Sequence, residues 1–228
     1  TFSNLNTGDL SEIEGQRQVV RGEDGRPLAS RETYLVVNQP LVNPRPGRPK
    51  RRFLQVRGVA DPQLAAAVHD LRLVPGGAWF SAAGVQAMPG KDAADAPTAI
   101  QAVLGEGVAR ELATDRTPEQ AAAARNRQRL DVGETFSLGN RTWIVAGIME
   151  SSGSTFNSEI WAKKSLIGPI FGKETFTTLV VRTKDAESAE QFKDFLNAKT
   201  ADPSSAAATL TEHLGDGCGA DRALPQQS

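Results

Sequence analysis

Residues 130–162, LDVGETFSLGNRTWIVAGIMESSGSTFNSEIWA, decide how the fold of this chain is interpreted. Two strand-like runs meet at Gly139-Asn140, a dipeptide typical of the tight turn in a β-hairpin. Apolar residues occupy both faces of the second run, Trp143 to Met149, as expected for a strand buried on two sides. The chain then breaks into small polar residues before apolar and aromatic residues resume. The segment therefore predicts a hairpin whose second strand leads through a bend back into the core.

The bend after Glu150 has three interpretations: a catalytic serine loop, a phosphate-binding loop, or a connection that only links and signals. Its serines flank Gly153 without the GxSxG elbow of serine hydrolases. A serine nucleophile also needs a base, usually histidine, that is oriented by a carboxylate. We favour the connection, because Gly153 can adopt backbone conformations closed to other residues. Phe156, Ile160 and Trp161 then re-anchor the chain in a core.

Glu159 is the charged residue of this bend. We expect its carboxylate to accept backbone N–H bonds and so hold the bend, and contact with a partner protein is the alternative. The candidate bend and partner loop comprises Gly153, Ser154, Phe156, Glu159 and Trp161.

The composition is that of an ordinary globular protein of 228 residues, with 39% hydrophobic and 23% charged residues. The net charge of −1, from 26 basic and 27 acidic residues, gives no reason to expect nucleic-acid binding, which depends on neutralising phosphates. One cysteine, Cys218, cannot form an internal disulfide or a multi-cysteine metal site. No run of ~20 apolar residues is present to cross a bilayer, and there is no initial Met or signal segment. We therefore expect a mature or excised piece of a longer protein.

Residues that carry chemistry are sparse. The two histidines, His69 and His213, are far apart in the sequence, and His69 is expected at the surface or flank of a helix and not as a metal ligand. Gly105-Glu106-Gly107 follows a strand, but the third glycine of GxGxxG is missing and no Walker A motif occurs. We interpret it as a tight strand-to-helix joint. The sequence predicts no catalytic residue, no cofactor and no metal site.

The rest of the chain alternates short strands and helices. Asp61-Pro62 is a helix start that Pro75-Gly76-Gly77 is expected to end, and Asp185 caps a last helix. The proline-rich segment 40–52 is interpreted as a solvated loop, with a basic anchor for anionic lipid as the alternative. Helices are also predicted near Leu10 and Ile13, over 106–113 and after Thr117, and strands over 16–22, 32–38, 53–60, 98–105 and 175–183.

Read in order, these pieces resemble the periplasmic core domain of MacB/FtsX-type ABC transporter permeases. The resemblance covers roughly residues 1–200 and is densest from 103 to 162. The sequence departs from the family pattern at Gly77-Ala78, where Gly-Arg is usual, in an apparent insertion at 114–129, and after Asp202. The matching motifs are Arg57-Gly58-Val59, Gly76-Gly77-Ala78-Trp79-Phe80, Val132-Gly133-Glu134, Trp143-Ile144-Val145-Ala146-Gly147-Ile148 and Gly153-Ser154-Thr155-Phe156-Asn157-Ser158-Glu159-Ile160-Trp161.

The resemblance implies an α+β fold with two lobes. A porter-like α+β lobe would be formed by both ends of the chain, residues 1–70 and 175–203. A mostly-β lobe with short helices, residues 71–174, would be inserted between them, and the tail at 204–228 is unassigned. The joints near 71–77 and 168–175 are the candidate hinges.

The resemblance also implies a non-catalytic role. The domain would lie outside the cell inner membrane, in the periplasm, between two membrane helices. It would pair with a second permease copy and transmit ATP-driven movement of a cytoplasmic ATPase subunit to cargo or to a periplasmic partner protein. A free-standing extracytoplasmic module that binds ligands or docks proteins is the alternative.

Overall fold

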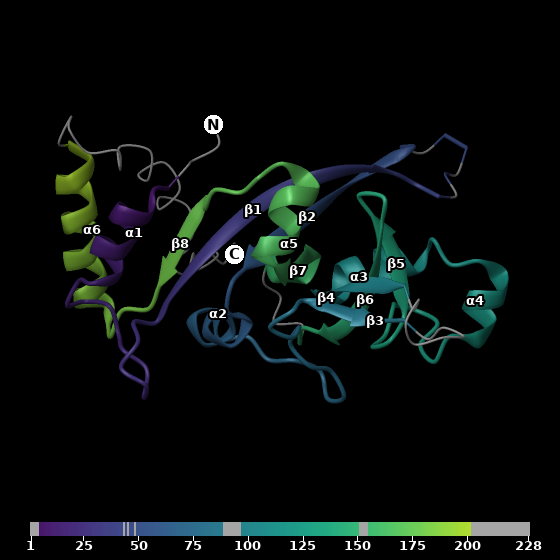
Figure 1. Ribbon diagram of the computed structural model, residues 1–228, viewed down its shortest axis with the longest axis horizontal. Helices are drawn as coiled ribbons and strands as arrows, with labels where there is room; N and C mark the ends of the chain where they lie inside the picture. Colours follow the sequence, from purple (N-terminus) through teal and green to yellow (C-terminus); the bar gives the residue numbers. More distant parts are fainter. Residues whose placement is uncertain are drawn as a thin grey trace, which may run out of the picture.

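The computed structural model describes residues 5–42, 44, 46–47, 49–88, 97–150 and 155–201. Its elements alternate along the chain, and Figure 1 labels them. In order they are α1 (Thr7–Glu14), β1 (Ala29–Pro40), β2 (Arg51–Val59), α2 (Pro62–His69), β3 (Val85–Ala87), β4 (Thr98–Leu104), α3 (Glu106–Ala113), α4 (Pro118–Ala123), β5 (Thr135–Leu138), β6 (Arg141–Ile148), the 3-10 turn η1 (Thr155–Ser158), β7 (Glu159–Lys163), α5 (Lys164–Phe171), β8 (Thr178–Val181) and α6 (Ala186–Ala201).

One mixed sheet runs through the described part of the chain, in the order β5-β6-β4-β7-β2-β1-β8, with β3 paired to β4. β1 and β2 form a long antiparallel ribbon, and β7 joins β2 in parallel. β7 is antiparallel to β4, which is parallel to β6. The α+β fold class is therefore confirmed, and segments far apart in the sequence lie side by side.

Helices cover this sheet at several places (Figure 1). The main core contains side chains of β2, β4, β6 and β7 packed with those of α3 and α5. A second cluster brings α2 and the following loop against Trp161 and Val103. At the other end, Phe192 and Leu196 of α6 pack with Ile13 of α1, so the two ends of the described chain share one small core.

Local sequence explains several of these elements. Gly139 and Asn140 have φ values of +59° and +56°, so the turn joining β5 to β6 is a type I′ turn, as their sequence predicts. Asp61 accepts the N–H groups of Gln63 and Leu64 and caps α2, and Asp185 accepts that of Ser188 at the start of α6. The predicted hairpin and both helix starts are confirmed.

Two predictions about local structure were wrong. Residues 16–22 do not form a strand and make only the isolated bridges Val19↔Thr183 and Arg21↔Pro27, because the turn that follows leaves too few residues for a ladder. α2 ends at Asp70, which has a left-handed φ of 55°, and so stops well before Pro75-Gly76-Gly77.

The division into two lobes remains a prediction. β7 belongs to the predicted inserted lobe, and it hydrogen-bonds to β2 of the porter-like lobe within the same sheet. Across the described residues, no helix has both the length and the apolar character that a membrane span requires.

Candidate functional site

Arg57 is the centre of a buried cluster of charged side chains. Its Nε and Nη2 atoms lie 2.7 Å from Glu159 Oε2 and Oε1, a two-point ion pair. Its remaining Nη1 donates to Glu32 Oε2. Relative exposure is 0% for Glu32 and 2% for Glu159, and only 11% for the Arg57 side chain. One guanidinium thus joins two buried carboxylates from different strands.

The sheet register brings these residues together. Arg57 on β2 lies opposite Tyr34 on β1 and Trp161 on β7. Glu32 precedes Tyr34 by two residues, and Glu159 precedes Trp161 by two residues. Side chains on alternate positions of a strand share one face, so both carboxylates lie on the same face of the sheet as Arg57. The pairing of β1, β2 and β7, and not a local sequence motif, therefore brings these side chains together.

His69 completes the cluster and corrects our expectation that it lies at the helix surface or flank. Its side chain is only 8% exposed, and its Nε2 lies 2.6 Å from Glu32 Oε1. The helix α2 packs on the sheet by the face that carries Ala65 and Val68, and its last residue therefore points at the charged cluster. The contact links α2 to β1.

Aromatic rings enclose the Arg57 guanidinium. Its Cζ lies 5.3 Å from the ring centroid of Tyr34, 5.6 Å from that of Phe156 and 5.5 Å from that of Trp161. Each distance is within the range of a cation–π interaction. The rings of Phe156 and Trp161 also meet His69 edge-on, at 4.9 and 5.3 Å. These rings keep water from the ion pairs and so strengthen them.

The pKa values of the cluster follow from burial and charge. Burial alone would raise the pKa of Glu32, but its hydrogen bond with His69 and the charge of Arg57 lower it below its ordinary value. Burial lowers the pKa of Arg57, and the two carboxylates outweigh it and raise that pKa. For Tyr34, burial and the negative charge of Glu159 raise the pKa. The lowered pKa of Glu32 and the raised pKa of Arg57 favour the charged forms of both side chains, as expected for an ion pair.

Whether Glu159 accepts backbone N–H groups of the bend stays a prediction, because residues 151–154 lie outside the described part of the chain. Among the described residues, its carboxylate binds Arg57 and accepts the indole N–H of Trp161 at 2.8 Å. Gly153 and Ser154 lie outside the described residues, so the predicted loop is only partly described, by Phe156, Glu159 and Trp161.

A close backbone contact holds the turn η1 in place. A Cβ atom on Gly105 would lie 2.2 Å from the carbonyl oxygen of Phe156 and 2.4 Å from that of Asn157. The N–H of Gly107 donates to Asn157 Oδ1 at 2.9 Å. The interpretation of Gly105-Glu106-Gly107 as a tight joint is thus supported, since the glycines admit a neighbouring backbone where a phosphate-binding loop would admit a phosphate.

The contacts described at this site are ion pairs, hydrogen bonds and cation–π contacts. Within the described ranges, no group of three or more His, Cys, Asp and Glu side chains is placed to hold a metal ion. The cluster couples β1, β2, β7 and α2 through ion pairs, and it ties them to the turn that carries Phe156.

Sequence reasoning missed two members of the cluster, Glu32 and Arg57. A charged residue inside an otherwise apolar strand was the available signal: Arg57 stands between Val56 and Gly58-Val59. Pairing it with Glu159 required the parallel register of strands that are 102 residues apart.

Comparison with known proteins gives one family and two solved structures of similar fold. The family model described as MacB-like periplasmic core domain matches residues 6–199. The extracellular domain of the noncanonic ABC-type transporter YknZ from Gram-positive bacteria has a TM-score of 0.50 and 12% identity, covering 83% of this chain and 79% of that chain. The periplasmic region of MacB from Actinobacillus actinomycetemcomitans has a TM-score of 0.51 and 12% identity, covering 96% of this chain and 86% of that chain. No curated protein sequence matches this one.

Proposed function

Because the chain belongs to the MacB-like periplasmic core domain family, the periplasmic region of ABC transporter permeases, we propose that it is a non-catalytic domain that transmits ATP-driven movement across the membrane. The expected partners are the cytoplasmic ATPase subunit of the same transporter, a second permease copy and a periplasmic partner protein. ATP hydrolysis is assigned to the ATPase subunit, since this chain has no Walker motif.

The Arg57 cluster is the single observation that carries this proposal. A domain that transmits movement must keep its parts in fixed positions relative to each other and bend at only a few segments. Arg57 joins Glu32 of β1 to Glu159 of β7, and Glu32 in turn contacts His69 of α2. Breaking a buried ion pair by removing one partner typically costs about 3–5 kcal/mol. Such a joint resists bending between the predicted lobes, so the proposed hinges at 71–77 and 168–175 would bend little while the Arg57 pairs are intact.

The continuous sheet gives further support. Movement applied to α1 and α6, at one end of the described chain, would reach β8 through a shared apolar core. From β8 it would pass to β1, β2 and β7 through the backbone hydrogen bonds of the sheet. The far end of the sheet, β5 and β6, would move with it.

The test uses the complete permease with its ATPase. The variant Glu159→Gln keeps the size of the side chain and removes the charge that binds Arg57. We expect transport to fall while ATP hydrolysis continues, because the variant uncouples the domain from the motor. Equal transport by the variant and the parent, at a temperature where both are folded, would overturn the proposal.

A free-standing module that binds ligands or docks proteins is the other candidate. The native gene separates the two: apolar stretches of ~20 residues on both flanks support the permease, and a cleavable signal with a stop codon after this domain supports the free module.

A further inference from the structure

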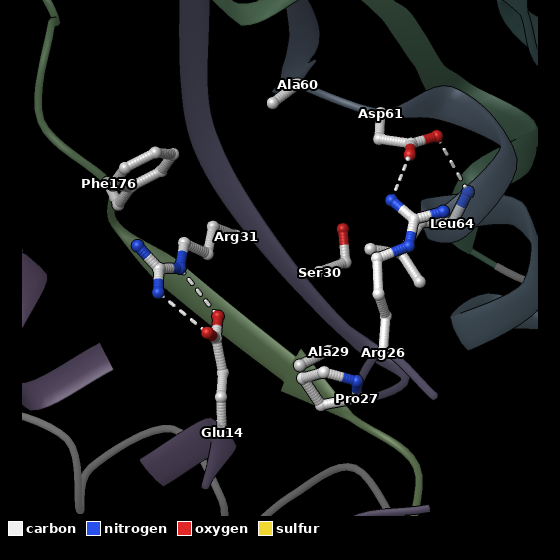
Figure 2. A pocket seen from close by; sticks show the side chains of 10 residues that line it. All are labelled: Glu14, Arg26, Pro27, Ala29, Ser30, Arg31, Ala60, Asp61, Leu64 and Phe176. Carbon is white, nitrogen blue, oxygen red and sulfur yellow. Dashed lines mark hydrogen bonds and ion pairs between the residues drawn. The ribbon is translucent and has the colours of Figure 1, made fainter. Parts of the chain in front are cut away.

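A cavity of about 280 Å³ lies between the start of β1, the start of α2 and the segment before β8. Figure 2 shows it from close by. Its apolar lining comes from Pro27, Ala29, Ala60, Leu64 and Phe176. A volume of this size holds a group comparable to one large side chain, below the usual range for drug-sized ligands.

At one end of the cavity each charged side chain has a partner of opposite charge, whereas at the other end the carboxylates outnumber the guanidinium groups. At one end Arg31 binds Glu14 by two contacts of 2.6 Å, and the two side chains are 26% and 15% exposed. This pair is bidentate and neutral, so it offers little to a charged ligand.

At the other end, two carboxylates share one guanidinium. Arg26 Nε lies 2.5 Å from Asp24, and its Nη1 lies 3.3 Å from Asp61 Oδ2. The pKa of Arg26 is raised mainly by its hydrogen bond with Asp24, so Asp24 is the main partner. An excess negative charge therefore remains at this end, beside Asp61.

Asp61 is held in place through one of its two carboxylate oxygens. Its Oδ1 accepts the N–H groups of Gln63 and Leu64 at 3.1 and 3.0 Å and caps α2. Among the described residues, its Oδ2 contacts only Arg26, at 3.3 Å, and the two side chains are 39% and 61% exposed. An ion pair so exposed contributes little, so a cation in the cavity can replace Arg26 at Asp61 while Arg26 keeps Asp24.

A second polar group faces the same space. Ser30 is buried, with 4% exposure, and Figure 2 shows its hydroxyl oxygen directed toward the part of the cavity between Ala60 and Asp61. Its hydroxyl also hydrogen-bonds Glu32, which helps to lower the pKa of that carboxyl. The lone pairs of the hydroxyl oxygen can still accept a hydrogen bond from an ammonium group.

We propose that this cavity binds an amphiphilic amine, with the ammonium group between Asp61 and Ser30 and one apolar group against Leu64 and Phe176. The amino end of a peptide and a small organic amine share this chemistry. The site does not depend on the proposed role in transmission, and its test can fail without affecting that role.

The test is a titration of the 228-residue domain followed by chemical shifts of the cavity residues. Phenylalaninamide represents the amino end of a peptide, phenethylamine a simple amine, and N-acetylphenylalaninamide the neutral counterpart. We expect the two amines to bind with Kd on the order of 1 mM, as the binding energy per atom of small ligands allows. The neutral compound should bind about tenfold more weakly, since it lacks a charge-assisted hydrogen bond.

The variant Asp61→Asn removes the charge and keeps an N-cap side chain, so α2 remains capped. It should weaken the amines about tenfold and leave the neutral compound unchanged. Glu23→Gln is the matched control, since Glu23 is exposed and does not line the cavity, and it should preserve amine binding. Ala60→Trp, at an exposed position on the rim, should abolish binding of all three compounds.

Three results would overturn the proposal: equal binding of charged and neutral compounds, equal loss in Asp61→Asn and Glu23→Gln, or unchanged binding in Ala60→Trp. Binding of phenethylamine without phenylalaninamide would assign the site to simple amines, and the reverse result would assign it to peptides.

Discussion

Arg57 and Glu159 form a two-point ion pair, with both N–O distances at 2.7 Å, although 102 residues separate them in the sequence. The pair is shielded by Trp161, whose indole N–H also binds Glu159. Its energetic role follows from burial: a carboxylate left alone in this environment has neither water nor a cation to stabilise its charge.

Arg57→Leu should therefore lower the free energy of unfolding by about 3–5 kcal/mol, because it leaves Glu32 and Glu159 without their cation. Urea denaturation measures the loss. Arg51→Leu is the control, since Arg51 is exposed and bonds to Asn38 only; it should change stability by less than about 0.5 kcal/mol. Similar effects of the two variants would show that the pair contributes little.

Stability should also depend on pH through Glu32. Its pKa in the folded protein is lowered from the ordinary value of 4.5, so the folded state binds this proton more weakly than the unfolded state. The carboxylate therefore stabilises the fold in full above about pH 4.5, and the contribution is lost as pH falls through the folded-state pKa. Urea denaturation of the parent and of Glu32→Gln, from neutral pH into the acid range, should give a stability difference that shrinks on acidification. A difference that stays constant would contradict the assignment.

Gly105→Ala tests the close contact with η1. The new methyl group would meet the carbonyl oxygens of Phe156 and Asn157, and overpacking of this kind typically costs about 1–3 kcal/mol. Hydrogen exchange should become faster at residues 155–158. Gly8→Ala is the comparison, because Gly8 lies in α1 and its Cβ would meet only the Asn6 side chain, at 3.3 Å. That change should alter stability by less than about 1 kcal/mol in either direction, because the better helix propensity of Ala is offset by a small shift of the capping Asn6 side chain.

Phe53→Ser tests whether the outer face of the β1–β2 ribbon contacts a partner. Phe53 is 69% exposed and Val36 51%, and the register places them diagonally across the two strands. Exposed apolar groups of this kind mark contact surfaces when they gather in patches. Stability of the isolated domain should change by less than about 0.5 kcal/mol, whereas transport by the complete permease should fall. Unchanged transport would exclude this face as a contact.

The sequence was sufficient for elements with strong local signals. Turn residues at Gly139-Asn140, the cap at Asp61-Pro62 and the two-sided apolar run from Trp143 all predict what the structure contains, because short-range sterics and burial decide these features. The expected α+β class followed from the resemblance and from the mixture of hairpins and helices.

The charged cluster could not be predicted in the same way. His69 was expected at the surface because its neighbours in the sequence include Asp70, a polar residue that here ends the helix in a left-handed conformation. The partner of Glu159, Arg57, lies on a strand far away in the sequence, so no residue near Glu159 indicates that it forms an ion pair. Only the register of β1, β2 and β7 shows that Glu32, Arg57 and Glu159 share one face.

The same register has a consequence for synthesis on the ribosome. β1 is made early, and the hydroxyl of its Thr33 donates to the carbonyl oxygen of Thr175, which emerges 142 residues later. Contacts so distant in sequence slow folding because a long loop must close first. Until β7 and β8 have left the exit tunnel, the ribbon of β1 and β2 has two unpaired edges, and a chaperone that shields strand edges would be needed longest during this interval.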